Sequence, residues 1–112
     1  MEVATLTEVL VCINQTRSVL NKKALANMPQ GRRYSASCCP LKLALADCGV
    51  VSVGIISVQV KTRTSAQKLA RLWSTEIRNA DASTRYIVDL IPLLYEFRKN
   101  FDSGSYPELI LP

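Results

Sequence analysis

Four cysteines are the residues of this 112-residue chain best suited to chemistry, because the chain contains no histidine. The commonest general base and metal ligand near neutral pH is therefore missing. The cysteines stand at positions 12, 38, 39 and 48, and none of them forms a Cys-x-x-Cys motif. A zinc site would need an unusual spacing, so we predict no metal and no cofactor.

Cys39 is the one cysteine with a specific argument for reactivity. It directly precedes Pro40, a residue that suits the first position of a helix, and Lys42 follows one turn later. A thiolate at a helix N-terminus is stabilised by free backbone amides and by nearby cations. We therefore take Cys39 as the candidate reactive thiol. The alternative interpretation is that Cys39 is only a small capping and core residue beside Pro40. No residue at a suitable spacing supplies a base for this thiol, and the acids are scattered along the chain. The sequence therefore gives an enzyme no support, although it does not exclude one.

Positive charge is the stronger signal. Ten basic residues and a single acid, Asp47, lie between Glu8 and Glu76, while the remainder of the chain is nearly neutral. Such an asymmetry favours an anionic partner. The predicted nucleic-acid or anion-binding residues are Lys22, Lys23, Arg32, Arg33, Tyr34, Lys61, Arg63, Lys68, Arg71 and Arg78.

Two segments are expected to present these residues. A capping box at 64–67 predicts a helix that continues to about Arg78, with Lys68, Arg71 and Arg78 on the face opposite its apolar stripe. The irregular stretch 24–37 carries the paired arginines and Tyr34, a ring able to stack on an exposed base. The competing interpretation is that the basic stripe is the ordinary solvated face of an amphipathic helix.

The remaining pattern predicts an α+β fold. Helices are expected at 5–21, at 40–48 with Gly49 as its stop, and from Pro92 to about residue 101. Strands are expected at 50–53, 55–61 and 85–90, with either a hairpin or a bulge at Gly54. Residues 109–111 are predicted to form a final edge strand. The result is one domain over 1–112, a small, mainly antiparallel sheet packed against about four helices.

The expected cellular compartment is inferred from the lack of a signal-peptide pattern and of a membrane-spanning stretch in the sequence. The N-terminus lacks the basic start and apolar run of a signal peptide, and no window approaches the length of a membrane span. We therefore expect a cytoplasmic protein with no membrane partner, in which the cysteines are free thiols.

These features favour a small, non-enzymatic binding module whose anionic partner is most simply nucleic acid. One alternative is a protein-binding regulator or inhibitor, of the kind carried by phages and mobile elements. An edge strand of Leu109, Ile110 and Leu111 would then pair with a partner's sheet or form a homodimer. Another alternative is a binder that sequesters a small anionic ligand such as a nucleotide. The Cys-Pro-x-x-x-Ala-Leu segment at 39–45 and the Phe-Asp-Ser-Gly segment at 101–104 are similar in general character to small phage-borne or bacterial proteins, a likeness that implies no activity.

Overall fold

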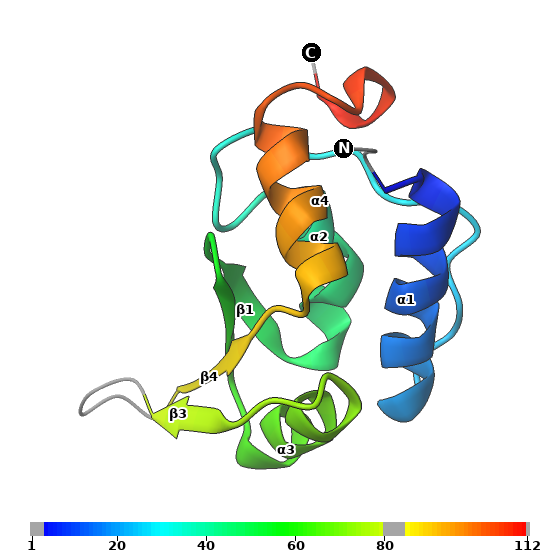
Figure 1. Ribbon diagram of the computed structural model, residues 1–112. Coiled ribbons are helices and arrows are strands. Elements are labelled where there is room, and N and C mark those ends of the chain that lie inside the picture. The colour runs from blue at the N-terminus through cyan, green and yellow to red at the C-terminus, as the bar shows by residue number, and fades with distance from the viewer. Residues whose placement is uncertain (1–3, 80–84, 112) are drawn as a thin grey trace.

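The computed structural model describes residues 4–79 and 85–111. Within these ranges the elements are α1 (Leu6–Val19), α2 (Pro40–Leu45), the 3₁₀ turn η1 (Ala46–Cys48), β1 (Val50–Val53), β2 (Ser57–Val60), α3 (Arg63–Leu72), β3 (Ile77–Asn79), β4 (Tyr86–Asp89), α4 (Pro92–Asp102) and the 3₁₀ turn η2 (Pro107–Leu109). The strands form one antiparallel sheet in the order β1-β2-β4-β3, and the helices lie to one side of it (Figure 1). The predicted α+β class is confirmed.

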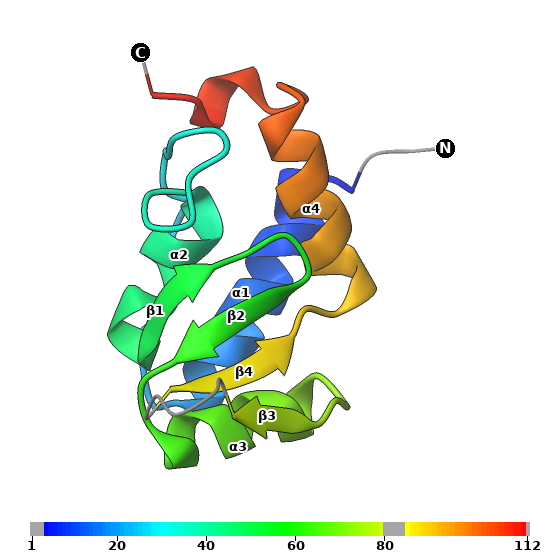
Figure 2. The same cartoon turned by 90° about the vertical axis from the view of Figure 1, so that its left-hand side faces the viewer.

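The sheet buries one face and leaves the other open. A view turned by 90° looks onto the open face, with α1 behind it (Figure 2). Val58, Val60 and Val88 are fully buried, whereas Gln59 and Ile87, which alternate with them, are only partly buried. This alternation is typical of an antiparallel sheet with helices on one side. The largest fully buried side chains are Phe97, Phe101, Ile13, Leu41, Leu45, Leu69, Leu94, Val9, Val50, Val53, Val58 and Val60.

Helix α1 begins and ends close to its predicted limits. The Thr5 hydroxyl accepts a hydrogen bond from the Glu8 amide at 3.1 Å, as expected of a capping residue. The helix ends at Val19, shortly before Asn21 takes a left-handed conformation with φ of 60°. In the part of the chain that the structure describes, this and every other helix lacks the length and apolar content needed to cross a membrane.

The segment from Cys39 to Val53 folds as predicted. Pro40 is the first residue of α2, and Leu41, Leu45 and Cys48 are buried along one side. Gly49 has φ of 90°, a left-handed conformation that glycine adopts without strain. The short helix therefore ends at the predicted glycine and leads directly into β1.

Gly54 begins a hairpin loop. Val53 pairs with Val58 across the two antiparallel strands, and the Gly54 amide donates to the Ser57 carbonyl at 2.8 Å. The register irregularity of this pair lies instead between Val50 and Ser52. The hairpin loop leaves Ile55 70% and Ile56 59% exposed. Two large apolar side chains therefore stand in solvent at one end of the sheet.

The prediction for α3 was wrong at both ends. The capping residue is Thr62, whose hydroxyl accepts from the Ser65 amide at 3.2 Å, so the helix starts before the predicted box at Thr64. It ends at Leu72, and Ser74 then adopts φ of 54°. Residues 77–79 pair with β4 instead of continuing the helix. This pairing gives their backbone amides and carbonyls the hydrogen-bond partners that a longer helix would have given them.

The C-terminal segment is not an edge strand, which corrects the prediction for 109–111. Pro107 opens the turn η2, and Leu109 packs into the core at 5% exposure. The backbone then pairs with Gly31 of the long loop, the segment between α1 and α2. The Gly31 amide donates to the Leu109 carbonyl at 2.8 Å, and the Leu111 amide donates to the Gly31 carbonyl at 3.0 Å. A homodimer built on a free strand at Leu109, Ile110 and Leu111 therefore loses its structural basis.

Candidate anion-binding surfaces

The structure separates the predicted anion-binding residues into two groups at opposite ends of the molecule. The loop that carries Arg32, Arg33 and Tyr34 lies beside the C-terminal end of α4, whereas α3 and the end of α1 lie at the other end (Figures 1 and 2). A hydrogen bond of 2.7 Å from Arg33 Nε to the Asp102 carbonyl fixes the first group there. The two segments that carry these residues therefore do not form one continuous surface.

Six of the predicted cations make up what we call the basic end: Lys22, Lys23, Lys61, Arg63, Lys68 and Arg71, all of them exposed. They come from three neighbouring segments. Val19, at the end of α1, lines a hollow together with Lys68 and Arg71 of α3. The Lys61 amide donates to the Gly49 carbonyl at 2.8 Å, which brings the start of α3 against the end of η1. The fold thus gathers at one end charges that are spread over 50 positions of the sequence.

Asp47, the one acid in the sequence between Glu8 and Glu76, is already paired. Arg17 donates to its two oxygens at 2.6 and 3.1 Å. The hydrogen bond from Arg17 lowers the pKa of the Asp47 carboxyl, an effect that outweighs the opposing effect of burial. Its negative charge is therefore balanced within the fold and offsets little of the basic end.

Arg78 does not belong to this group, contrary to the prediction. It lies on β3 rather than on α3, because the helix ends at Leu72. Its guanidinium forms an ion pair with Asp89 on the neighbouring strand β4. The prediction that Lys68, Arg71 and Arg78 share one helical face was therefore wrong, because it extended the helix beyond Leu72.

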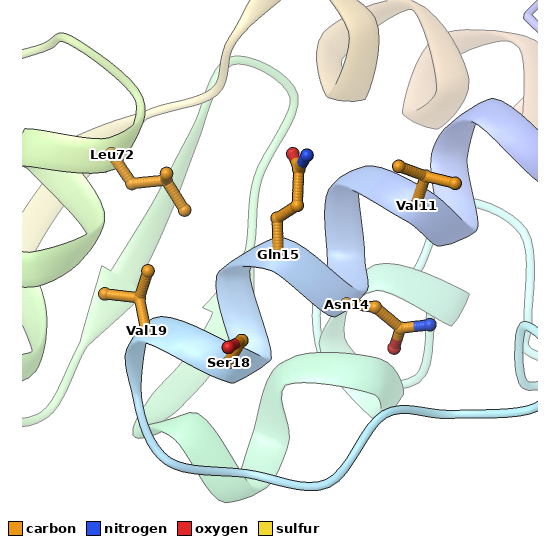
Figure 3. Close-up of a pocket in the computed structure, with 6 residues that line it drawn as sticks. All are labelled: Val11, Asn14, Gln15, Ser18, Val19 and Leu72. Atoms are coloured by element: carbon orange, nitrogen blue, oxygen red, sulfur yellow. The ribbon is translucent and has the colours of Figure 1, made fainter.

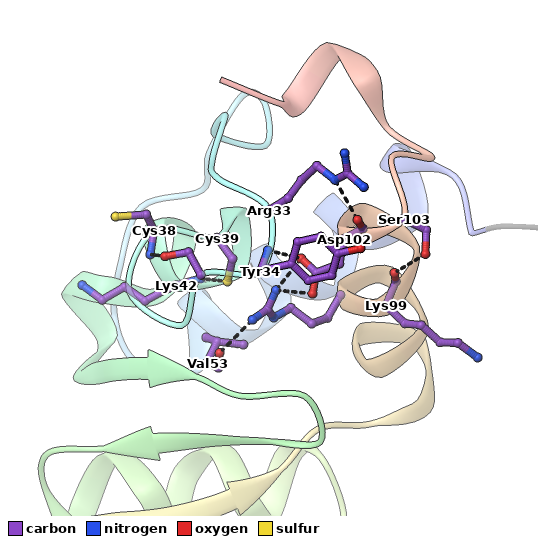
Figure 4. A network of polar contacts seen from close by, with 11 residues as sticks. Arg33, Tyr34, Cys38, Cys39, Lys42, Val53, Lys99, Asp102 and Ser103 are labelled. Atoms are coloured by element: carbon purple, nitrogen blue, oxygen red, sulfur yellow. Dashed lines mark hydrogen bonds and ion pairs between the residues drawn. The ribbon is translucent and has the colours of Figure 1, made fainter. Parts of the chain in front are cut away.

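Tyr34 projects from the other group in an unusual conformation. Its φ of 55° is left-handed, which is a genuine outlier for a bulky residue, and its side chain is 73% exposed. The Tyr34 amide donates to Asp102 Oδ1 at 2.8 Å, and the Arg33 guanidinium lies 5.4 Å from the ring centroid (Figure 4). The loop is therefore held so that an aromatic ring faces solvent.

Arg98 completes this arrangement and was not among the predicted site residues. Its Nη1 donates to both oxygens of Asp102 at 2.7 Å, and its Nη2 donates to the Val53 carbonyl at 3.4 Å. Only 4% of the residue is exposed. Two features of the sequence could have identified Arg98. It lies on the apolar stripe of α4, four residues after Leu94, and an acid follows four residues later.

Cys39 caps the N-terminus of α2 as predicted, but its surroundings do not favour the reactive thiolate. Its sulfur accepts from the Lys42 amide at 3.4 Å (Figure 4), yet the side chain is completely buried. Burial raises the pKa of the Cys39 thiol and outweighs the opposite effects of the Lys42 amide and of Arg98. The local environment therefore favours the unreactive thiol, and Cys39 is better explained as a capping residue in the core. Cys38, beside it, is half-buried.

An apolar groove runs between α1 and α3 next to the basic end. Its lining includes three of the exposed large apolar side chains, Val11, Val19 and Leu72, and its volume is about 680 Å³. Figure 3 shows Val19 and Leu72 facing each other across it. This groove escaped sequence analysis because the three residues belong to two helices whose contact the sequence does not reveal.

Among the described residues, no three histidine, cysteine, aspartate or glutamate side chains gather where they could hold a metal ion. The sites therefore rest on cations, exposed apolar groups and one aromatic ring. Comparison with protein-family models, with curated protein sequences and with solved structures gives no match to this chain.

Proposed function

We propose that this protein is a small binding module that holds nucleic acid through its basic end. The observation that carries the proposal is the group of six exposed cations, drawn from three segments of the chain. In the described residues around them, the acids are Asp47, which Arg17 already pairs, and Glu76. A surface with this excess of positive charge attracts the phosphate backbone whatever the base sequence.

This surface supports backbone binding rather than base reading. Its lysine and arginine side chains, which lie on one helix and two turns, are suited to contact phosphates, and phosphate contacts carry no sequence information. Each phosphate that they neutralise releases bound counterions, so affinity falls as salt rises. A small anion would meet fewer of these cations at once and would bind more weakly for the same reason.

The test is the binding of a fluorescent duplex, followed by anisotropy between about 50 and 200 mM salt. For the double variant Lys68→Glu with Arg71→Glu we expect the affinity for the duplex to fall at least about tenfold. The slope of log affinity against log salt concentration should become shallower by the amount that about two phosphate contacts contribute. Lys42→Glu provides the control, because Lys42 lies on α2 outside the basic end. It should alter binding far less than Lys68→Glu alone.

Two results would refute the proposal. One is a double variant that binds the duplex as tightly as the unchanged protein. The other is an equal loss in Lys68→Glu and in Lys42→Glu, since a general effect of net charge would produce it without any defined surface.

A protein partner is the second candidate, and the α1–α3 groove is the observation that favours it. Val11 is 54%, Val19 39% and Leu72 38% exposed, and clustered apolar side chains of this kind mark contact surfaces. If a partner protein docks there, Leu72→Ser should abolish its stoichiometric binding and leave duplex binding intact. Lys68→Glu separates the two candidates, because nucleic-acid binding depends on that charge.

A further inference from the structure

A second pocket lies at the end of the molecule opposite to the basic end, where three segments meet. It is lined by Tyr34 from the long loop, Ile55 from the hairpin, and Arg98, Lys99, Asp102 and Ser103 from α4, and its volume is about 430 Å³. That volume is in the range of small-molecule sites. Tyr34 and Ile55 supply its aromatic and aliphatic surface, and Lys99, which also lines it, is exposed (Figure 4).

The exposed groups of this pocket are not explained by folding. Tyr34 is 73% and Ile55 is 70% exposed, so neither contributes much to the core. The left-handed backbone of Tyr34 is strained as well, and it persists because the Asp102 carboxylate accepts its amide. Strained backbone of this kind clusters at binding and active sites, which makes the exposed Tyr34 ring a candidate contact for a ligand.

Arg98, in the wall of the same pocket, has an unused hydrogen-bond donor. Its Nη1 and Nη2 are occupied by Asp102 and Val53. Its Nε is buried and has no hydrogen-bond partner among the described atoms. Buried donors are nearly always paired, so this unpaired Nε is a donor that the contacts of the fold leave unsatisfied in a residue of the pocket wall.

We infer that this pocket binds one unpaired nucleobase together with its phosphate, an inference that rests on the proposed nucleic-acid function. The base would stack on the Tyr34 ring and contact Ile55 on its edge, since a flat aromatic ligand fits an aromatic and aliphatic wall. A carbonyl oxygen of the base would accept from Arg98 Nε once binding exposes this atom, which is buried in the free protein. Lys99 and Arg33 would face the phosphate.

The same chemistry could come from a free nucleotide or from a single strand, and the probes distinguish them. Thymidine monophosphate represents the first. An oligothymidylate of about twelve nucleotides, which has little structure of its own, represents the second. A duplex of equal length offers phosphates without unpaired bases. We expect the oligothymidylate to bind more tightly than the duplex, because the pocket adds a stacked base to the backbone contacts.

Tyr34→Gly is the decisive variant, because glycine accepts the left-handed backbone and the fold should remain intact. It should weaken oligothymidylate binding about tenfold and leave duplex binding unchanged. Tyr34→Phe, which keeps the ring, should bind as the unchanged protein does. Leu43→Ser, which removes a 41% exposed apolar group on α2, controls for a general loss of exposed apolar surface.

The two proposals fail in different ways. If Tyr34→Gly binds the oligothymidylate normally, the pocket is not a base site, although the basic end can still be correct; the exposed groups would then be assigned to a protein contact. If Lys68→Glu with Arg71→Glu leaves all binding unchanged while Tyr34→Gly abolishes it, the basic end is wrong and the pocket stands. Binding of thymidine monophosphate that depends on Tyr34 would show that a free nucleotide suffices.

Discussion

Arg17 shows how a charged side chain can serve as a structural centre. It is almost fully buried, and it donates to the Lys23 carbonyl at 2.6 Å and to the Ala44 carbonyl at 2.7 Å as well as to Asp47. One guanidinium thereby joins α1, α2 and the start of the long loop. Its place in the apolar stripe of the first helix was visible in the sequence, but its partners, up to 30 residues away, were not.

The Arg17–Asp47 pair predicts a specific loss of stability in acid. The Asp47 pKa is lowered in the folded protein, so its stabilisation is complete above the pKa of an unfolded aspartate, about 3.9. It is lost as the pH falls through the lower folded value. Urea unfolding at several pH values should show Asp47→Asn less stable than the unchanged protein near neutrality, with the difference shrinking below about pH 4. A difference that stays constant down to the most acidic pH would contradict this.

The cysteines predict one fast-reacting thiol rather than four equal ones. Burial raises the pKa of the Cys12, Cys39 and Cys48 thiols, and all three are buried, whereas Cys38 is half-buried. Because the thiolate is the reacting species, alkylation of the native protein should proceed mainly at Cys38. Mass spectrometry of the labelled peptides measures this directly, and denaturant should expose all four. Rapid labelling of Cys39 in the native protein would contradict this prediction and support Cys39 as the reactive thiol.

The third helix provides a direct comparison of two threonines. Thr62 caps α3 in the structure, whereas the sequence pattern indicated Thr64. Thr62→Ala should therefore reduce the free energy of unfolding by about 1 kcal/mol, since it removes the acceptor for the Ser65 amide. Thr64→Ala, one residue inside the helix start and exposed, should change it by less than about 0.5 kcal/mol. Thermal or urea unfolding of the two variants measures the difference, and the reverse order would favour the predicted cap.

Elements were predictable where the signals that define them are local. Pro40 and Gly49 mark the two ends of one short helical segment. The pattern around Gly54 predicted either a hairpin or a bulge, and the structure has the hairpin. The errors arose where tertiary contacts decide. Residues 77–79 form a strand because they pair with β4, the next element along the chain, instead of extending α3. Leu109 belongs to a turn, where its side chain is buried and its carbonyl accepts from the Gly31 amide, which is far away in the sequence.

The candidate sites were predictable in composition but not in arrangement. The excess of basic residues before Glu76 was evident, and six of them do share one end of the molecule. What the sequence does not show is that Arg33 and Tyr34 are held at the other end by Asp102, some 68 residues away. Long-range contacts of this kind place the predicted residues on two separate surfaces, and they bring Tyr34 into the pocket that includes Arg98.

Gly31 is the point at which these distant parts are joined. A Cβ atom at this position would lie 2.5 Å from the Cys38 carbonyl oxygen and 2.7 Å from Pro40, distances that ordinary contacts never reach. The Gly31 backbone also pairs with Leu109 and Leu111. Gly31→Ala should therefore force the loop away from α2 and release the C-terminal segment.

We expect Gly31→Ala to reduce the free energy of unfolding by about 1–3 kcal/mol. We also expect limited proteolysis to remove residues after Gly104 faster than in the unchanged protein, because their two backbone hydrogen bonds to Gly31 would be lost. Gly54→Ala is the control, since its nearest contact is 3.3 Å from the added carbon and its backbone is not left-handed. The variant should also weaken oligothymidylate binding, because the displaced loop carries Tyr34. Equal stability and equal proteolysis in the two glycine variants would show that the loop and the C-terminal segment do not depend on each other.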